Sequence, residues 1–186
     1  MGAARRLFFA LWPDPGVRRQ LEALARALPT RWRAVASADL HLTVLFLGAV
    51  AEDQLEPLCR AVDPLRVAAF DQALTRLETW AGGALCCCSG NAHEALTGLH
   101  RALASAAGGV GLELERREYR PHVTLARARR SAPGPAARTL DAPLHLHAQA
   151  LVLAESAGHP VAGPRYHPLR VWPFGTHAAG SFRINK

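Results

Sequence analysis

One short pattern occurs twice in this chain and constrains its fold and chemistry more than any other feature. His41-Leu-Thr43 opens one apolar run, and His122-Val-Thr124 opens another. An apolar run of this kind predicts a buried strand, in which residues two apart face the same side. Each histidine is therefore expected to face the same side as its threonine, and the repetition indicates an active site to which two strands contribute.

The residue types in the pattern suit acid-base chemistry at phosphorus. Histidine has the side-chain pKa nearest neutrality, so two imidazoles in one cleft can act as a general acid and a general base together. In-line displacement at phosphorus needs the attacking and leaving oxygens on opposite sides of the phosphorus atom. Two copies of one motif, related by a pseudo-twofold axis, supply this arrangement, with the hydroxyls of Thr43 and Thr124 donating to the phosphoryl oxygens between them. A single copy would have an ordinary structural explanation, whereas two copies favour the functional one.

Four segments of the sequence carry a resemblance to a known family: residues 6–13, 39–48, 120–127 and 165–173. Together they resemble the bacterial and archaeal RNA 2′,3′-cyclic phosphodiesterases of the 2H phosphoesterase superfamily, first named 2′-5′ RNA ligases. The resemblance spans about residues 5–174, and the paired His-x-Thr is its specific part.

The resemblance implies a role for each motif residue. His41 corresponds to the proton donor, His122 to the proton acceptor, and Thr43 and Thr124 to the phosphate-binding threonines of similar proteins. Arg127, which closes the second motif, corresponds to a phosphate-contacting cation. In a regular strand it would face away from His122, so we expect a bulge or the strand's end to turn it inward. No cofactor and no metal ion are implied.

The reaction that the resemblance implies is metal-independent hydrolysis of RNA 2′,3′-cyclic phosphate ends to 2′-phosphate ends, with 2′-5′ ligation as a minor reverse activity. The partners would be RNA with such ends, tRNA fragments or nucleotides. A net charge of +7 and a pI near 10.2, which come almost entirely from arginine, fit a polyanionic partner. Genomic composition is an equally good explanation of the arginine content.

Two alternative functions fit the sequence less well. A non-catalytic RNA-binding module using the basic cleft would be favoured if one motif histidine were missing, but both are present. A metal- or serine-dependent hydrolase would need a dense His/Asp/Glu cluster or a Gly-x-Ser-x-Gly elbow, and the sequence shows neither.

Other candidate residues have mainly structural interpretations. Cys86, Cys87 and Cys88 are adjacent, so in a strand their side chains alternate faces and cannot surround one metal ion. They stand where similar proteins have an aromatic residue, so a base-stacking role is not carried over to this strand. His145 and His147 share a strand face without an evident third metal ligand. Asp39 is either a carboxylate that orients the His41 imidazole or a turn residue.

The order of expected elements predicts an α+β fold of two similar lobes, with antiparallel sheets that face a central cleft and helices on the outer faces. The first half is expected to contain, in chain order, strand 7–11, a helix capped by Asp14 and stopped by Pro29, strand 32–35, the first motif strand and helix 52–62. It is followed by strands 67–78 and 84–88, a helix from Asn91 to about 106, strand 112–116 and the second motif strand. A loop over 129–142 and strands 144–153 and 166–171 complete the expected order.

Residues 1–174 are expected to form one bilobal domain, and residues 175–186 a C-terminal tail that is disordered or an artefact of cloning. The apolar stretch near the N-terminus is too short for export, and no run is long enough to span a membrane. We therefore expect a cytoplasmic monomer.

Overall fold

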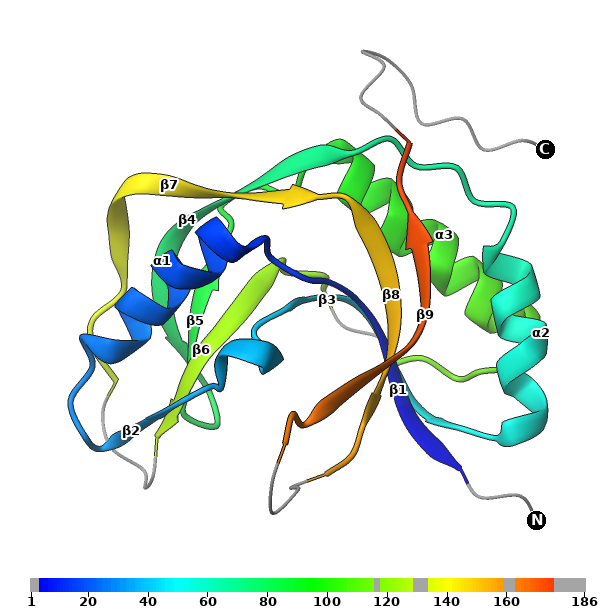
Figure 1. The fold of residues 1–186 in the computed structure, drawn as a ribbon, viewed down its shortest axis with the longest axis horizontal. Helices are drawn as coiled ribbons and strands as arrows, with labels where there is room; N and C mark the ends of the chain where they lie inside the picture. The colour runs from blue at the N-terminus through cyan, green and yellow to red at the C-terminus, as the bar shows by residue number, and fades with distance from the viewer. Residues whose placement is uncertain (1–3, 116–117, 129–133, 159–162, 176–186) are drawn as a thin grey trace.

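Nine strands of the described residues form one antiparallel sheet, against which three α-helices pack (Figure 1). The computed structural model describes residues 4–115, 118–128, 134–158 and 163–175. The elements in chain order are β1 (Arg5–Leu11), α1 (Pro15–Arg26), β2 (Trp32–Ala34), a short 3₁₀ helix (Ser37–Asp39), β3 (Leu42–Val50), α2 (Glu52–Val62), β4 (Phe70–Trp80), β5 (Ala84–Cys88), α3 (Glu94–Gly109), β6 (His122–Ala128), β7 (Arg138–Ala148), β8 (Ala150–Ser156) and β9 (Tyr166–Pro173).

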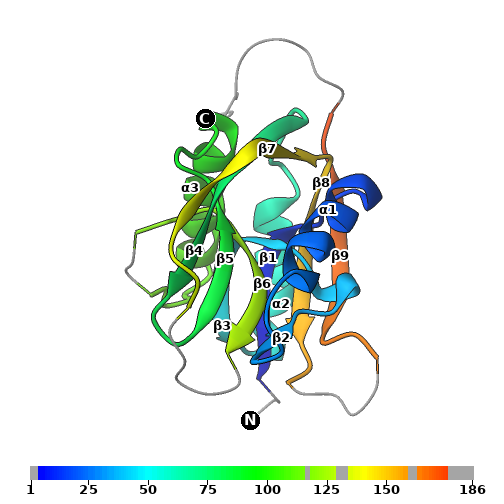
Figure 2. The same ribbon diagram turned by 90° about the vertical axis from the view of Figure 1, so that its left-hand side faces the viewer.

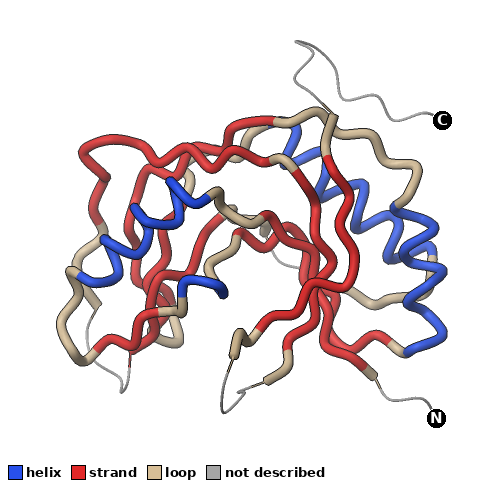
Figure 3. Tube along the Cα trace, in the orientation of Figure 1, coloured by secondary structure: helices blue, strands red, loops and turns tan. Residues whose placement is uncertain are grey.

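The sheet consists of two wings that meet at the two motif strands. The strand order is β7-β4-β5-β6-β3-β1-β8-β9, and β2 pairs with β6 beside this path. β3 and β6 pair through Leu42 and Val123 alone. We call β7, β4, β5, β6 and β2 the β6 wing, and β3, β1, β8 and β9 the β3 wing. The tube view shows the strands of the two wings joined in one arch (Figure 3). The α+β class with antiparallel sheets is thus confirmed.

Two helices each pack on the wing that does not contain the strand before them. α1 follows β1 in sequence but packs on β2, β6 and β7, while α3 follows β5 but packs on β3 and α2. In Figure 2, turned by 90°, α1 and α3 lie on opposite sides of the β4–β5 hairpin. The chain therefore crosses from one wing to the other at each of these two helices.

The helices form for reasons that are visible in the sequence. The Asp14 carboxylate accepts hydrogen bonds from the backbone N–H groups of Gly16 and Val17 at 2.7 and 3.1 Å, and Pro15 occupies the first turn of α1. Val17, Leu21 and Ala25 are buried at a spacing of four, as an amphipathic helix requires. The predicted helix 52–62 is found with the same bounds.

The structure corrects four expected elements. His93, not Asn91, caps α3, because its Nδ1 accepts from the N–H of Ala95. Residues 112–115 form no strand. The apolar run 144–153 is divided between β7 and β8, on different wings, and β7 already begins at Arg138, inside the expected loop 129–142. Residues 129–133 of that loop lie outside the described part of the chain.

The main core lies between the sheet and the two helices α2 and α3, where Leu58, Leu96, Leu99 and Leu103 are fully buried. Gly175 is tied to the fold, because its N–H donates to the Val67 carbonyl at 2.9 Å. The rest of the expected tail, residues 176–186, lies outside the described residues. Within the described chain, no helix is both long and apolar enough to cross a membrane.

Candidate active site

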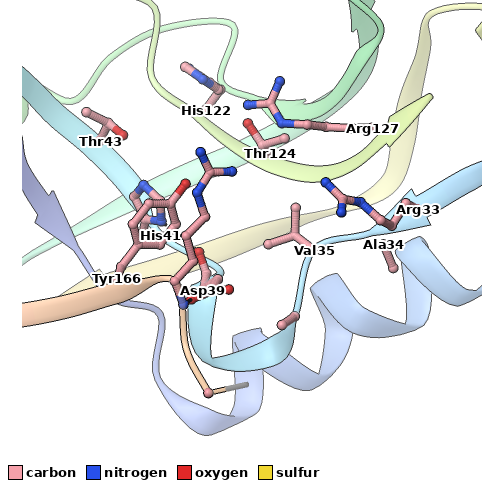
Figure 4. Close-up of a pocket in the computed structure, with 13 residues that line it drawn as sticks. Arg33, Ala34, Val35, Asp39, His41, Thr43, His122, Thr124, Arg127 and Tyr166 are labelled. Carbon is pink, nitrogen blue, oxygen red and sulfur yellow. Dashed lines mark hydrogen bonds between the residues drawn. The ribbon is translucent and has the colours of Figure 1, made fainter. Parts of the chain in front are cut away.

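The two His-x-Thr motifs lie side by side at the seam between the wings. Leu42 of β3 is paired with Val123 of β6 in antiparallel register. Continuing that register places His41 opposite Thr124, and Thr43 opposite His122. A pseudo-twofold axis thus passes between Leu42 and Val123, as the repetition predicted (Figure 4).

The alternation of faces along both strands also follows the prediction. Leu42, Val44, Val123 and Leu125 are buried in the core at 0–1% exposure, while the histidines and threonines between them are half-buried. His122 is the first residue of β6, and His41 lies immediately before β3. All four polar side chains line one cavity of about 430 Å³.

A backbone carbonyl holds each imidazole in the same way. The Nδ1 of His41 lies 2.7 Å from the Asp39 carbonyl oxygen, and the Nδ1 of His122 lies 2.8 Å from the Arg120 carbonyl oxygen. A carbonyl oxygen only accepts hydrogen bonds, so Nδ1 must be the donor in both rings. The neutral tautomer therefore has its lone pair on Nε2, the nitrogen available for proton transfer.

The surroundings of the two imidazoles differ. The ring of His41 is enclosed by Phe8, Trp12 and Tyr166, whose ring centroids lie 4.9, 5.4 and 4.7 Å away. This burial lowers the pKa of His41 to about 4, and the nearby charge of His122 acts in the same direction. In the free protein His41 is thus neutral at pH 7.

The ring of His122 packs against the ring of Trp80, with the centroids 4.3 Å apart. The guanidinium of Arg120 covers Trp80 at 4.8 Å, and both donate to the Glu78 carboxylate, at 2.8 Å from Arg120 and 3.2 Å from the indole N–H. These contacts hold the pKa of Glu78 below its usual value. Trp80, Glu78 and Arg120 therefore form a fixed wall beside His122.

Arg127 reaches the cavity through a bulge in β6, one of the two possibilities that the sequence suggested. Leu85 is paired with Ala126 and Cys86 with Thr124, so Leu125 is an extra residue on β6. An extra residue shifts the two-residue alternation by one position, so Arg127 faces the same side as Thr124. It lines the cavity together with the motif residues.

The three adjacent cysteines are structural in this arrangement. Cys87 packs into the main core, whereas Cys86 and Cys88 pack on the opposite face of β5, as the alternation predicted. Burial raises the pKa of the Cys86 thiol to about 11, so the group is neutral at physiological pH. Its sulfur lies 3.8 Å from Thr124 Oγ1 and contacts that side chain from the neighbouring strand.

Asp39 does not orient His41 with its carboxylate. Its backbone carbonyl does so, while the carboxylate accepts a hydrogen bond from the N–H of Arg165 at 2.8 Å. Asp39 therefore anchors the start of β9, which carries Tyr166, to the first motif. Of the two alternatives that the sequence left open for Asp39, the structure favours the turn residue, because Asp39 ends the short 3₁₀ helix Ser37–Asp39.

Several cavity residues were not identified from the sequence. Tyr166 and Arg165 belong to segment 165–173, which carried the family resemblance without any assigned role. The same holds for Trp12 of segment 6–13, which stacks on His41 without lining the cavity. Arg33 lies on the short strand β2 and had no signal of its own. The residues that line the cavity are Arg33, Ala34, Val35, Ala36, Asp39, His41, Thr43, His122, Thr124, Arg127, Gly163, Arg165 and Tyr166.

Three further features lie outside this arrangement. His147 donates to the Asp71 carboxylate at 2.7 Å on β7, away from the cavity. Among the described residues, no group of three or more His, Cys, Asp or Glu side chains is placed to hold a metal ion. A larger hollow of about 630 Å³ beside α2 and β9 has no histidine among its lining residues, and its Asp63 carboxylate is bound by Arg170 and Trp172.

Comparisons with known proteins agree with this geometry. Residues 12–160 match the sequence model of the 2′-5′ RNA ligase superfamily. A protein of Geobacillus stearothermophilus named RNA 2′,3′-cyclic phosphodiesterase is 34% identical over 114 residues, which are 54% of this chain and 33% of that protein. The match thus spans about a third of that relative's length.

Solved structures of similar proteins superpose on this chain over most of its length. The crystal structure of E. coli LigT complexed with 3′-AMP superposes with a TM-score of 0.80 and 26% identity, covering 92% of this chain and 98% of LigT. A crystal structure described as a phosphoesterase superposes equally well, with a TM-score of 0.80, 27% identity and the same coverage.

Proposed function

This chain belongs to the 2′-5′ RNA ligase superfamily, and we propose that it hydrolyses the 2′,3′-cyclic phosphate at the end of an RNA to a 2′-phosphate, by two-histidine acid-base catalysis without a metal ion. The observation that carries the proposal is the pair of carbonyl-anchored imidazoles related by a pseudo-twofold axis across one cavity. The similar LigT structure holds 3′-AMP, which supports a nucleotide end as the ligand.

In the proposed reaction, the Nε2 of His122 removes a proton from water as the water oxygen attacks phosphorus. The bond from phosphorus to O3′ breaks, and the Nε2 of His41 donates a proton to the departing O3′. The phosphate stays on O2′. Thr43 and Thr124 donate hydrogen bonds to the non-bridging oxygens, and Arg127 offsets their charge.

The low pKa of His41 is compatible with the role of proton donor. Its proton is disfavoured in the free protein because the ring is buried and other cations lie near it. A bound phosphate anion would oppose those cations and favour the imidazolium. Once protonated, an imidazolium in such surroundings is a strong acid, which helps an alkoxide to leave.

The proposed substrates are RNA ends that carry the cyclic ester, including tRNA fragments, and nucleotides. Ring strain activates the ester, which removes the need for a metal ion or other cofactor. The same base and acid can use an RNA 5′-hydroxyl in place of water, which would give a 2′-5′ linkage as a minor reverse activity.

The test is an assay of an oligonucleotide with a 2′,3′-cyclic phosphate end in the presence of EDTA. We expect full conversion to a product that resists an enzyme specific for 3′-phosphates. Quantitative phosphate release by that enzyme would place the cut on the 2′-oxygen and reverse the assignment of His41. Binding of the oligonucleotide without any conversion would favour the non-catalytic RNA-binding module instead.

A further inference from the structure

The cavity contains one arginine, Arg33, to which the proposed chemistry at the terminal phosphate gives no role, and this arginine lies beside Arg127. Arg33 of β2 and Arg127 of β6 are direct partners across the two strands, and both line the cavity. Both side chains are exposed. Like charges directly opposite each other in a sheet repel, so this pairing costs stability unless an anion lies between them.

Neither guanidinium has a carboxylate partner among the described residues. By contrast, Arg120 and Arg76 are paired with Glu78, at 2.8 and 3.2 Å. Arg165, the third arginine that lines the cavity, also has no carboxylate partner among the described residues, but its guanidinium lies over the Tyr166 ring at 5.5 Å. Arg33 and Arg127 differ from it because they face each other directly across two strands. Planar guanidinium groups in pairs are the side chains best suited to bind phosphate by several hydrogen bonds.

The position of the pair relative to the histidines indicates which phosphate it would take. Arg127 lies three residues after Thr124 on β6, roughly 10 Å along a strand, and β2 lies roughly 5 Å beyond β6. Figure 4 shows both guanidinium groups extending into the cavity from the side of Thr124, with Arg33 farther from the histidines than Arg127. A phosphate between them would lie about one nucleotide from the reacting one.

A cyclic phosphodiester carries one negative charge, which the threonine hydroxyls and Arg127 can accommodate alone. The next phosphate of a nucleic acid that ends in a 2′,3′-cyclic ester is the one on O5′ of the same nucleoside. We propose that Arg33, with Arg127 beside it, binds this 5′-side phosphate and makes the protein selective for substrates that carry one. This inference rests on the proposed function.

Two kinds of substrate carry a phosphate on O5′. One is a mononucleotide with a 5′-phosphate monoester, and the other is a longer RNA, in which a diester joins the previous nucleotide. Three substrates separate them: a nucleoside 2′,3′-cyclic phosphate, the same compound with a 5′-phosphate, and a dinucleotide with a cyclic end. Each is assayed with the wild type, with Arg33→Gln, and with Arg101→Gln, a matched control on α3 that removes the same charge from an exposed position outside the cavity.

We expect Arg33→Gln to lower kcat/KM by about 10–100-fold on the substrates with a 5′-side phosphate and by less than about 3-fold on the simple one, as for the loss of one charge-assisted contact. A loss confined to the dinucleotide would assign the subsite to the diester, and a loss on both would assign it to any 5′-side phosphate. Equal losses on all three substrates, or no loss on any, would overturn the proposal. Arg101→Gln should leave all three rates unchanged.

A binding measurement tests the subsite without turnover. By calorimetry, the wild type should bind a nucleoside 3′,5′-bisphosphate about 10-fold more tightly than the 3′-monophosphate, and Arg33→Gln should abolish the difference. If the wild type opens no cyclic ester but shows this preference, the proposed reaction fails while the subsite stands. If the wild type turns over substrates but shows no preference for the bisphosphate, the subsite fails and the reaction stands.

Discussion

At the scale of single residues, the two histidines share one anchoring contact but differ in their surroundings. Both rings donate Nδ1–H to the carbonyl of the residue two positions before, so the local sequence fixes the tautomer. The aromatic enclosure of His41 comes from β1 and β9 and the wall beside His122 from β4. The motif alone therefore predicted which residues face the cavity, but it contained no information on what would surround them.

The first prediction concerns catalysis by these rings. Replacing His41 or His122 with Ala should lower turnover of a cyclic-phosphate substrate by about 10²–10⁴-fold, because each change removes one proton-transfer group, and the wild-type rate should be bell-shaped in pH. His147→Ala, which removes an exposed imidazole on β7, is the matched control. Retention of more than about a third of the wild-type rate in either site variant, with an unchanged circular dichroism spectrum, would exclude the two-histidine mechanism.

The threonines give a second prediction. Thr43→Val and Thr124→Val keep the shape and strand preference of the side chain and delete one hydroxyl, so each should lower kcat by about 10–10³-fold, as for loss of one contact to an oxyanion. Steady-state kinetics on the same substrate measure the effect. Unchanged kinetics in both variants would assign the hydroxyls to packing against neighbours such as Cys86.

The buried His41 also predicts how stability depends on pH. Its pKa is about 4 in the folded protein and about 6.5 for a solvent-exposed histidine in the unfolded chain, so between these values the unfolded state binds more protons. The contribution of the neutral ring to the free energy of unfolding is present above about pH 6.5 and is lost as the pH falls toward 4. The loss is on the order of 2 kcal/mol by pH 5. His41→Gln should remove this part of the acid destabilisation, which urea unfolding at pH 7 and pH 5 measures. An equal loss of stability in wild type and variant between the two pH values would show that His41 is not the group responsible.

At the scale of elements, two aromatic side chains support the first motif strand from behind. β3 meets β6 through one residue pair only. The Nδ1–H of His100 donates to the Val44 carbonyl at 2.8 Å, and the Tyr119 hydroxyl donates to the Thr43 carbonyl at 3.4 Å. The two rings are stacked at 4.2 Å. At the seam, these two side chains supply hydrogen bonds to β3 carbonyls that a neighbouring strand would otherwise supply.

We expect His100→Phe to destabilise the fold by about 1–3 kcal/mol, because it keeps the stack and leaves the carbonyl of the buried residue Val44 without its partner. Tyr119→Phe, which removes only the longer hydrogen bond, should cost less. Urea unfolding at pH 7 measures both. A larger effect of Tyr119→Phe would mean that the stacked pair supports β3 mainly through the tyrosine.

The sequence predicted correctly those elements whose bounds depend on local contacts. It failed for elements whose bounds depend on which strands pair. Asp14 and Pro15 defined α1 because capping is local. The run 144–153 has a continuous strand pattern, yet β7 pairs with β4 and β8 pairs with β1 and β9. Periodicity shows which side a residue faces, but not which sheet edge it joins. Asn91 was assigned as a cap because it too has a capping side chain, two residues before His93.

At the scale of the whole molecule, the repeated motif correctly predicted an axis of near symmetry, but not the crossing of the helices between the wings. Packing of α1 on β6 and of α3 on β3 is a long-range arrangement that no sequence window contains. As a result, each motif strand is covered by a helix whose preceding strand lies in the other wing.

The final prediction concerns the balance between the two proposed reactions at the seam, hydrolysis and ligation. Water, at roughly 55 M, competes with an RNA 5′-hydroxyl that is concentrated only when a second RNA end is bound, so hydrolysis should dominate and ligation should rise with the concentration of 5′-hydroxyl RNA. In the proposed mechanism both reactions use His122 as the base, so His122→Ala should lower them by the same factor. A labelled RNA with a cyclic end, incubated with increasing 5′-hydroxyl RNA, gives both products on one gel, and a nuclease specific for 3′-5′ linkages should leave the joined product intact at the new bond. If His122→Ala lost hydrolysis but kept ligation, the two reactions would not share the site at the seam.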